Sequence, residues 1–187
     1  MKQLVLASQS PRRAELLKNA GFEFIVRPAS VDETVRPGEA PEQHVERLAF
    51  EKAHAVPSTP DEIVIAADTI VVLDHEILGK PRDADDAERM LTLLSGRKHE
   101  VLTAICLRCG AEAAQELAAT NVWFMTLSAV QIHDYVATGE PMDKAGAYAI
   151  QGIASRYIER IDGSYSNVVG LPIAAVHRLL NRANRPC

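Results

Sequence analysis

The hydrophobic pattern of the chain alternates between continuous apolar runs and longer segments with helical spacing. The continuous runs predict strands at 4–7, 22–26, 62–73, 76–78, 100–107, 116–126, 149–152 and 155–161. Apolar residues that recur every three or four positions predict helices at 11–20, 41–56, 84–95, 128–138 and 168–182. Polar and glycine-rich segments predict turns or loops at 74–75, around 110, at 141–148 and at 162–167. Paired strands with helices between them predict an α/β fold with a mixed sheet.

The run 62–73 carries the least expected residue of the chain. Its β-branched residues follow one another without polar alternation, which is typical of a central strand covered on both faces. Asp68 interrupts this run, although a lone carboxylate is rarely buried. Either Asp68 pairs with a buried arginine or caps a turn, or the strand carries it to the floor of a cleft.

The first strand, 4–7, leads through a loop of small residues into a helix. Ser10 suits the N-cap and Pro11 the first helical position. Free N–H groups at a helix start favour anions, whereas the helix dipole disfavours the cations of Arg12 and Arg13 there. An arginine pair is often simply solvated, but Ser-x-Ser-Pro-Arg-Arg after a buried strand favours phosphate binding.

Two lysines and one acidic pair have a structural and a functional interpretation. Lys52 falls on the apolar stripe of helix 41–56, so it either reaches solvent along its own stem or lines a cleft and meets a phosphate. Lys80 lies between Gly79 and Pro81, in a loop that either exposes it or holds it over an anion. Asp32 and Glu33 lie in a polar loop, where solvated carboxylates are commoner than metal ligands.

The composition is that of one globular domain. With 187 residues, 47% of them hydrophobic, the chain is expected to form a single domain, 1–187, with room for two lobes. A nucleic-acid partner is not expected, because the net charge is −5 and the basic residues are scattered. Any anionic ligand should therefore be small and bound by a local cluster.

Nothing in the sequence predicts export or a membrane span. The apolar start at 4–7 is too short for a secretory signal, and the run 63–73 is split by Asp68 and Thr69. We therefore expect a cytoplasmic protein. Cys106, Cys109 and Cys187 are interpreted as ordinary thiols, because residues three apart on a strand point to opposite faces.

Read together, the motifs resemble the Maf family of nucleoside triphosphate pyrophosphatases over almost the whole chain, from Leu4 to about Leu180. The matching segments are Ser8–Arg13, Val31–Thr34, Glu51–Ala53, Ala67–Thr69, Gly79–Arg82, Asp143–Tyr148, Ile150–Gly152 and Asn167–Pro172. The resemblance implies a long mixed β-sheet flanked by helices, with two lobes around a cleft, similar to inosine triphosphate pyrophosphatases. It also implies hydrolysis of a nucleoside triphosphate to the monophosphate and pyrophosphate with a divalent metal, and leaves a homodimer open.

By position, the resemblance assigns roles to individual residues. Asp68 matches the catalytic proton acceptor, and the residues that match the lining of the cleft are Ser10, Arg13, Glu33, Lys52 and Lys80. We expect phosphate to be bound by Ser8, Ser10, Arg13, Lys52 and Lys80. Arg12, Thr69 and Gln151 match three positions that separate subfamilies and resemble the dTTP/UTP type, which also tends to accept modified pyrimidine nucleotides. A sister group that acts on 7-methyl-GTP carries Trp, Gln and Glu there.

Elementary chemistry adds a metal to this assignment. An ordinary aspartate, with a pKa near ~3.9, is a weak base at neutral pH, whereas a metal-bound water ionises far more easily. We therefore expect Asp68 and Glu33 to hold Mg²⁺ or Mn²⁺. The alternatives are a 7-methyl-GTP pyrophosphatase, a nucleotide-binding regulator of cell division with little turnover, and an α/β domain that binds another phosphorylated ligand.

Overall fold

The strands of the chain form one seven-stranded sheet. The computed structural model describes residues 2–183, and its strands lie in the order β2-β1-β3-β5-β6-β7, with β4 paired to β3. They are β1 (Gln3–Leu6), β2 (Phe24–Val26), β3 (Glu62–Leu73), β4 (Glu76–Leu78), β5 (Lys98–Cys109), β6 (Glu112–Phe124) and β7 (Ile158–Asp162). β1 runs parallel to β2 and β3, whereas β4 is antiparallel to β3 and β7 to β6. The predicted mixed sheet is confirmed.

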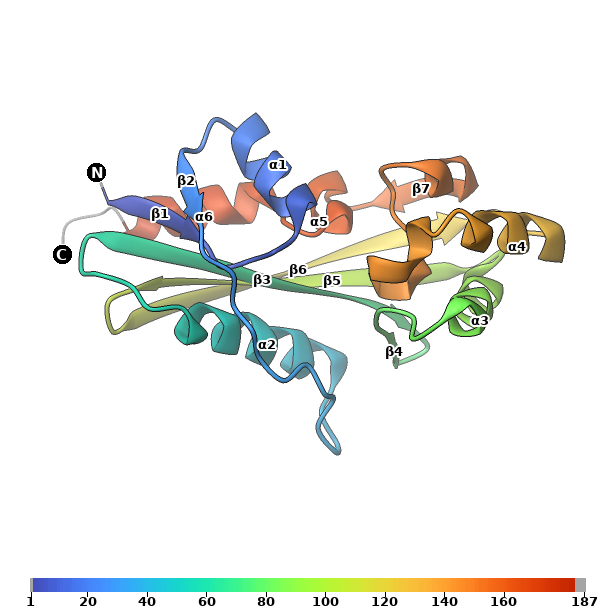
Figure 1. Ribbon diagram of the computed structural model, residues 1–187, viewed down its shortest axis with the longest axis horizontal. Coiled ribbons are helices and arrows are strands. Elements are labelled where there is room, and N and C mark those ends of the chain that lie inside the picture. Colours follow the sequence, from blue (N-terminus) through green and yellow to red (C-terminus); the bar gives the residue numbers. More distant parts are fainter. Residues whose placement is uncertain (1, 184–187) are drawn as a thin grey trace. The chain divides into compact units, whose positions relative to one another are not determined.

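Helices alternate with these strands along the chain (Figure 1). They are α1 (Pro11–Asn19), α2 (Pro41–Ala55), α3 (Ala84–Leu94), α4 (Ala129–Ala137), α5 (Tyr165–Val169) and α6 (Ile173–Ala183). Short 3₁₀ helices follow α4: η1 (Glu140–Asp143), η2 (Ala145–Ala147) and η3 (Ile153–Tyr157). Within the described residues, no helix is both long and apolar enough to cross a membrane.

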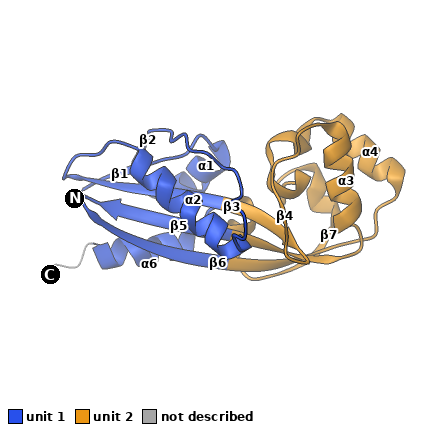
Figure 2. Ribbon diagram, turned by 90° about the horizontal axis from the view of Figure 1, so that it is seen from below, with its two compact units in different colours: residues 1–68, 103–118, 170–187 blue, residues 69–102, 119–169 orange. Residues whose placement is uncertain are grey.

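The chain divides into two compact units (Figure 2). The first contains the described residues of 1–68, 103–118 and 170–187, and the second contains 69–102 and 119–169. Strands β3, β5 and β6 pass from one unit into the other, and the boundary on β3 falls between Asp68 and Thr69. The cleft expected between two lobes stays a prediction.

In the first unit, the alternation of side chains along β3 decides which helix each residue meets. Ile63, Ile65 and Ala67 belong to a core cluster with residues of α1 and α6. Because successive strand residues point to opposite faces, Asp68 points to the other face. Figure 1 shows α2 on that other face, across the strands from α1 and α6. The fold therefore presents Asp68 to α2.

In the second unit, α3 and α4 pack together beside a core that is rich in aromatic rings. The rings of His99, Phe124 and Tyr148 contact one another edge to face, with centroids 4.7 to 5.4 Å apart. Gly146 closes this core, because a Cβ there would lie 2.8 Å from the side chain of Val71 and its φ is +67°. A side chain at position 146 would force the loop away from β3.

Most predicted elements are confirmed, and the differences lie after α4. The tight turn at Asp74 and His75 is confirmed, with φ of 49° and 69°. The predicted strand 149–152 is wrong, because that segment has no ladder partner and ends at Gly152, whose φ of +117° a strand does not accommodate. The predicted strand 155–161 is confirmed from residue 158 onward, where β7 begins, whereas residues 155–157 belong to the 3₁₀ helix η3. The predicted loop at 141–148 overlaps the short helices η1 and η2, and the predicted turn at 162–167 overlaps α5. The predicted helix 168–182 is wrong at its start, because residues 170–172, which end in Pro172, separate α5 from α6.

Candidate active site

The loop between β1 and α1 is built around the side chain of Ser8. Its hydroxyl accepts hydrogen bonds from the backbone N–H of Ser10, at 3.1 Å, and from Nη1 of Arg13, at 3.3 Å. Ser10 occupies the N-cap position of α1 with an extended backbone, but its hydroxyl does not cap the helix. The predicted N-cap position is thus confirmed, and the first N–H groups of α1 are left to other acceptors.

Arg13 links this loop to the ends of two other segments of the same unit. Its Nη1 donates to the carbonyl of Ala67 at 2.7 Å, and its Nε donates to the carbonyl of Gly170 at 2.8 Å. Burial lowers the pKa of Arg13, and the nearby carboxylate of Asp68 opposes that shift. The guanidinium therefore lies in a desolvated place close to Asp68, where its charge acts over a short range.

The carboxylate predicted to be out of place on β3 meets the lysine predicted to point inward from α2. Nζ of Lys52 lies 2.6 Å from Oδ1 of Asp68 and 2.5 Å from Oε1 of Glu33. The side chains of Lys52 and Asp68 are only 11% and 9% exposed, whereas that of Glu33 is 47% exposed. Asp68 is thus paired with a lysine, and neither with an arginine nor as a turn cap. Two carboxylates converge on one ammonium at the surface of this unit.

A network that the sequence pattern did not single out holds the loop of Glu33 against α2. Arg47 donates to the carboxylate of Glu39 at 2.5 and 2.8 Å and to the carbonyl of Thr34 at 3.1 Å. Nδ1 of His44 lies 3.0 Å from the same carboxylate. The hydrogen bond from Arg47 holds the pKa of Glu39 well below its usual range. Charged residues at 39, 44 and 47 on one side of a helix start were the only signal in the sequence.

The carboxylate oxygens of Glu33 and Asp68 are compatible with a divalent cation. Glu33 and Asp68 both direct carboxylate oxygens at Nζ of Lys52, so the two side chains already enclose one positive charge. Mg²⁺ and Mn²⁺ prefer oxygen ligands and are often held by two carboxylates together with substrate phosphates. Among the described residues, no group of three or more His, Cys, Asp or Glu side chains forms a complete cage. The residues fit a cation whose remaining ligands are phosphate and water.

The remaining predicted site residues belong to other parts of the chain. Arg12 follows Pro11 at the start of α1 and is half-buried. Thr69, Lys80 and Gln151 belong to the second unit, where Lys80 is exposed and the other two are partly buried. Lys80 follows Gly79, whose carbonyl accepts a hydrogen bond from the N–H of Gly146 at 3.0 Å. Their convergence with Lys52 and Asp68 stays a prediction.

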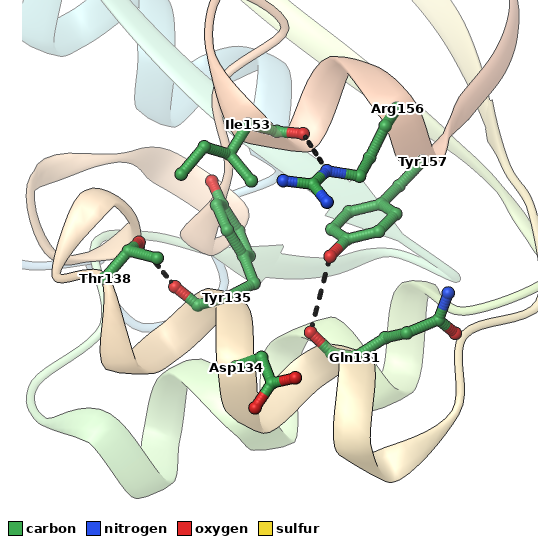
Figure 3. A pocket seen from close by; sticks show the side chains of 7 residues that line it. All are labelled: Gln131, Asp134, Tyr135, Thr138, Ile153, Arg156 and Tyr157. Atoms are coloured by element: carbon green, nitrogen blue, oxygen red, sulfur yellow. Dashed lines mark hydrogen bonds between the residues drawn. The ribbon is translucent and has the colours of Figure 1, made fainter.

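A small pocket of about 150 Å³ lies in the second unit, beside α4 (Figure 3). It is lined by Gln131, Asp134, Tyr135, Thr138, Ile153, Arg156 and Tyr157. None of the predicted site residues is among them.

The thiol prediction holds for two of the three cysteines. Cys106 and Cys109 are free, and burial raises the pKa of Cys106 to about 11. Cys187 lies outside the described residues.

The chain is similar over almost its whole length to proteins named dTTP/UTP pyrophosphatase. The dTTP/UTP pyrophosphatase of Anaeromyxobacter dehalogenans strain 2CP-1 is 56% identical over 188 residues, which cover 98% of this chain and 95% of that protein. The dTTP/UTP pyrophosphatase of Desulfotalea psychrophila is 53% identical over 183 residues, which cover 96% of this chain and 94% of that protein.

Solved structures confirm the expected fold. The Ham1 protein of Staphylococcus aureus matches with a TM-score of 0.55 and 15% identity, over 98% of this chain and all (100%) of that one. A HAM1 protein from Coxiella burnetii matches with a TM-score of 0.54 and 16% identity, over 98% of each chain. The family model described as Maf-like protein matches residues 3–183, so this chain belongs to the Maf family.

Proposed function

We propose that this protein hydrolyses nucleoside triphosphates, with dTTP and UTP preferred, to the monophosphate and pyrophosphate. Relatives with 56% and 53% identity over nearly the whole chain carry the name of that activity. The observation that carries the proposal is the buried carboxylate of Asp68, held 2.6 Å from the ammonium of Lys52. We further propose that the chain acts as one domain in the cytoplasm and accepts modified pyrimidine nucleotides.

The reaction needs charge neutralisation and alignment more than covalent help from the protein. Water attacks the α-phosphorus, the bond from that phosphorus to the bridging oxygen of the β-phosphate breaks, and pyrophosphate leaves with the bonding electrons. In this proposal Asp68 orients the water and takes its proton. Lys52, Arg13 and Lys80, with the hydroxyls and N–H groups around Ser8 and Ser10, neutralise the oxygens.

A divalent cation completes the proposed site. Glu33 and Asp68 would hold Mg²⁺ or Mn²⁺, since their carboxylates already converge on one positive charge. When bound, such a cation makes a water more acidic and offsets phosphate charge. Lys52 would then turn from the carboxylates toward the phosphates.

We propose Arg12, Thr69 and Gln151 as the residues that choose the base. The side-chain amide of Gln151 offers one donor group and one acceptor, which suits the edge of uracil or thymine. Thr69 offers a hydroxyl next to Asp68 on β3, and Arg12 offers a cation at the start of α1.

Pyrophosphate release from a panel of triphosphates tests this proposal. The panel is dTTP, UTP, CTP, pseudo-UTP, 7-methyl-GTP, ATP and GTP, each with Mg²⁺ and Mn²⁺. Strong release from dTTP and UTP is expected, and Asp68→Asn should reduce it by at least ~10³-fold while the protein stays folded. Asp32→Asn is the matched control, because Asp32 is exposed in the Glu33 loop and an amide oxygen still accepts from Thr34.

Other outcomes of the panel contradict parts of the proposal. If Asp68→Asn keeps more than a few per cent of the activity, the role of Asp68 is wrong. If 7-methyl-GTP is preferred, the three base-selecting positions are wrong. Tight nucleotide binding without release from any substrate would indicate a regulator instead.

A swap of the three base-selecting residues tests the specificity directly. In the variant Arg12→Trp, Thr69→Gln, Gln151→Glu, the ratio of kcat/KM for UTP to that for 7-methyl-GTP is expected to fall. An unchanged ratio would contradict the assignment.

A further inference from the structure

The segment that carries Gln151 has no regular secondary structure of its own. It follows η2 and precedes η3, and no strand pairs with residues 149–152. A side chain that must discriminate one base from another needs a backbone that does not move. Contacts from α4 and η1, in the same unit, provide that support.

The carboxylate of Glu140 binds the backbone two residues after Gln151. Both of its oxygens lie 3.1 Å from the backbone nitrogen of Ile153, so the N–H of Ile153 is shared between them. Gly152 lets the carboxylate come this close, because a Cβ there would lie 2.8 Å from Oε1 of Glu140. The φ of Gly152, +117°, is also one that side chains rarely adopt.

The hydroxyl of Tyr135 holds the same carboxylate in place. It donates a hydrogen bond to Oε1 of Glu140 at 3.0 Å. Tyr135 is 1% exposed, and its burial and Glu140 raise the pKa of the hydroxyl, which remains a neutral donor. Tyr135 and Ile153 both line the pocket beside α4 (Figure 3).

We propose that Tyr135 and Glu140 are positioning residues that fix Gln151 for base recognition. Glu140 holds the backbone at Ile153, two residues after Gln151, and Tyr135 holds the carboxylate of Glu140. A charged acceptor is the stronger partner for a backbone N–H, which explains a carboxylate at this place. The inference rests on the proposed function through the role of Gln151.

Substitution of Tyr135 by phenylalanine separates this role from packing. Tyr135→Phe keeps the ring and removes the hydrogen bond from the hydroxyl to Glu140. Tyr157→Phe is the matched control, since Tyr157 faces the same pocket, its ring packs against Tyr135, and its hydroxyl donates to Gln131 on α4 at 3.4 Å. For Tyr135→Phe we expect the KM for UTP to rise about tenfold, kcat to change less than about twofold, and the UTP to GTP ratio of kcat/KM to fall.

Glu140 provides a second, graded variant. Glu140→Gln retains one acceptor oxygen, so it should disturb the KM for UTP less than Glu140→Ala. In a Gln151→Ala background, neither Tyr135→Phe nor Glu140→Gln should lower the UTP to GTP ratio further, because residues that act through one another are not additive. Additive losses, or equal losses in Tyr157→Phe, would overturn the positioning role.

Hydrogen exchange at the amide of Ile153 measures how firmly Tyr135 and Glu140 hold the backbone there, independently of activity. In the wild-type protein this amide is expected to exchange slowly, and in Tyr135→Phe and Glu140→Ala at least about tenfold faster, with little change in Tyr157→Phe. Unchanged exchange in both variants overturns the inference. If exchange at Ile153 becomes faster in both variants but Gln151→Ala leaves the KM for UTP and the UTP to GTP ratio of kcat/KM unchanged, the base-selecting role of Gln151 is wrong. The role of Tyr135 and Glu140 in holding the backbone at Ile153 is then still supported.

Discussion

The two units of the molecule differ in the polar groups that they bury. In the first unit, the buried side chains of Lys52 and Asp68 form an ion pair, and Arg47 is paired with Glu39. In the second unit, His99, Thr120 and Asn167 are buried and neutral, whereas the buried carboxylate of Asp86 is paired with Arg89. Nε2 of His99 lies 2.8 Å from the hydroxyl of Tyr148 in an aromatic core. Both units thus pair a buried carboxylate with a cation, and hydrogen bonds between neutral groups also hold the core of the second unit.

Asn167 shows the same neutral character in the second unit. Its side-chain amide donates to the carbonyl of Val101 at 3.0 Å and to the hydroxyl of Thr120 at 2.8 Å, and the residue is 0% exposed. Hydrogen bonds between neutral groups hold a loop in place without the long-range electrostatic field of a charged group. The comparison teaches that a buried ion pair is the more demanding arrangement, because removing one partner leaves an uncompensated charge, whereas a neutral hydrogen bond leaves only an unsatisfied polar group.

Removal of the ammonium of Lys52 breaks this contrast most strongly. Lys52→Met leaves the carboxylate of Asp68 buried without its cation, so the free energy of unfolding should fall by roughly 3 kcal/mol, as for other broken buried pairs. Urea denaturation measures the change.

A double variant identifies the cause of that loss. Lys52→Met, Asp68→Asn should recover a substantial part of the stability, because the remaining amide is neutral. If the double variant is no more stable than Lys52→Met alone, lost packing rather than an uncompensated charge explains the effect.

A decrease in pH tests the buried neutral histidine of the second unit. Burial lowers the pKa of His99 from 6.5 to about 3, so between these values the unfolded chain binds a proton that the native protein does not. The free energy of unfolding should therefore fall as the pH drops through this window, by about 1.4 kcal/mol per pH unit from this group alone.

The variant His99→Gln isolates that contribution. Between pH 6.5 and 4.5, above the range in which most carboxylates titrate, its stability should depend less on pH than that of the wild-type protein. An NMR titration that shows protonation of His99 near pH 6 in the folded protein would contradict the prediction.

The smallest expected effect concerns the network around Glu39. Arg47→Met removes the hydrogen bonds that hold the loop of Glu33 to α2, so the KM for UTP should rise by a few fold with a modest loss of stability. Arg36→Met is the control, because Arg36 pairs through its exposed side chain with Glu51, and its backbone N–H still donates to Glu39. Equal effects of the two variants would indicate a general loss of surface charge.

The sequence pattern predicted the places of the catalytic candidates better than their partners. Strand periodicity marked Asp68 as unusual on β3, and helical periodicity placed Lys52 on the inward side of α2. Their contact depends on how α2 crosses the sheet, which is a property of the packed fold and not of either segment. For Glu33, a solvated loop was the commoner expectation, and only the folded loop brings it to Lys52.

The segment around Gln151 shows where local pattern fails. Its apolar residues predicted a strand. Hydrophobic periodicity depends on side chains alone and does not show which groups form hydrogen bonds with the backbone. In the structure, the carboxylate of Glu140 takes the N–H of Ile153, and Gly152 adopts a φ of +117°. The resemblance to a family located Gln151, but the residues that hold it became visible only in the fold.

The ammonium of Lys52 has a consequence for the moment at which substrate arrives. Two carboxylates in one small space repel each other, and a site built from them alone would tend to open. With Nζ 2.5 and 2.6 Å from their oxygens, Lys52 keeps them together before any nucleotide is present. When substrate binds, Lys52 exchanges its ionic partners while the two carboxylates are already in place. Assembly of the site therefore costs little free energy at each turnover.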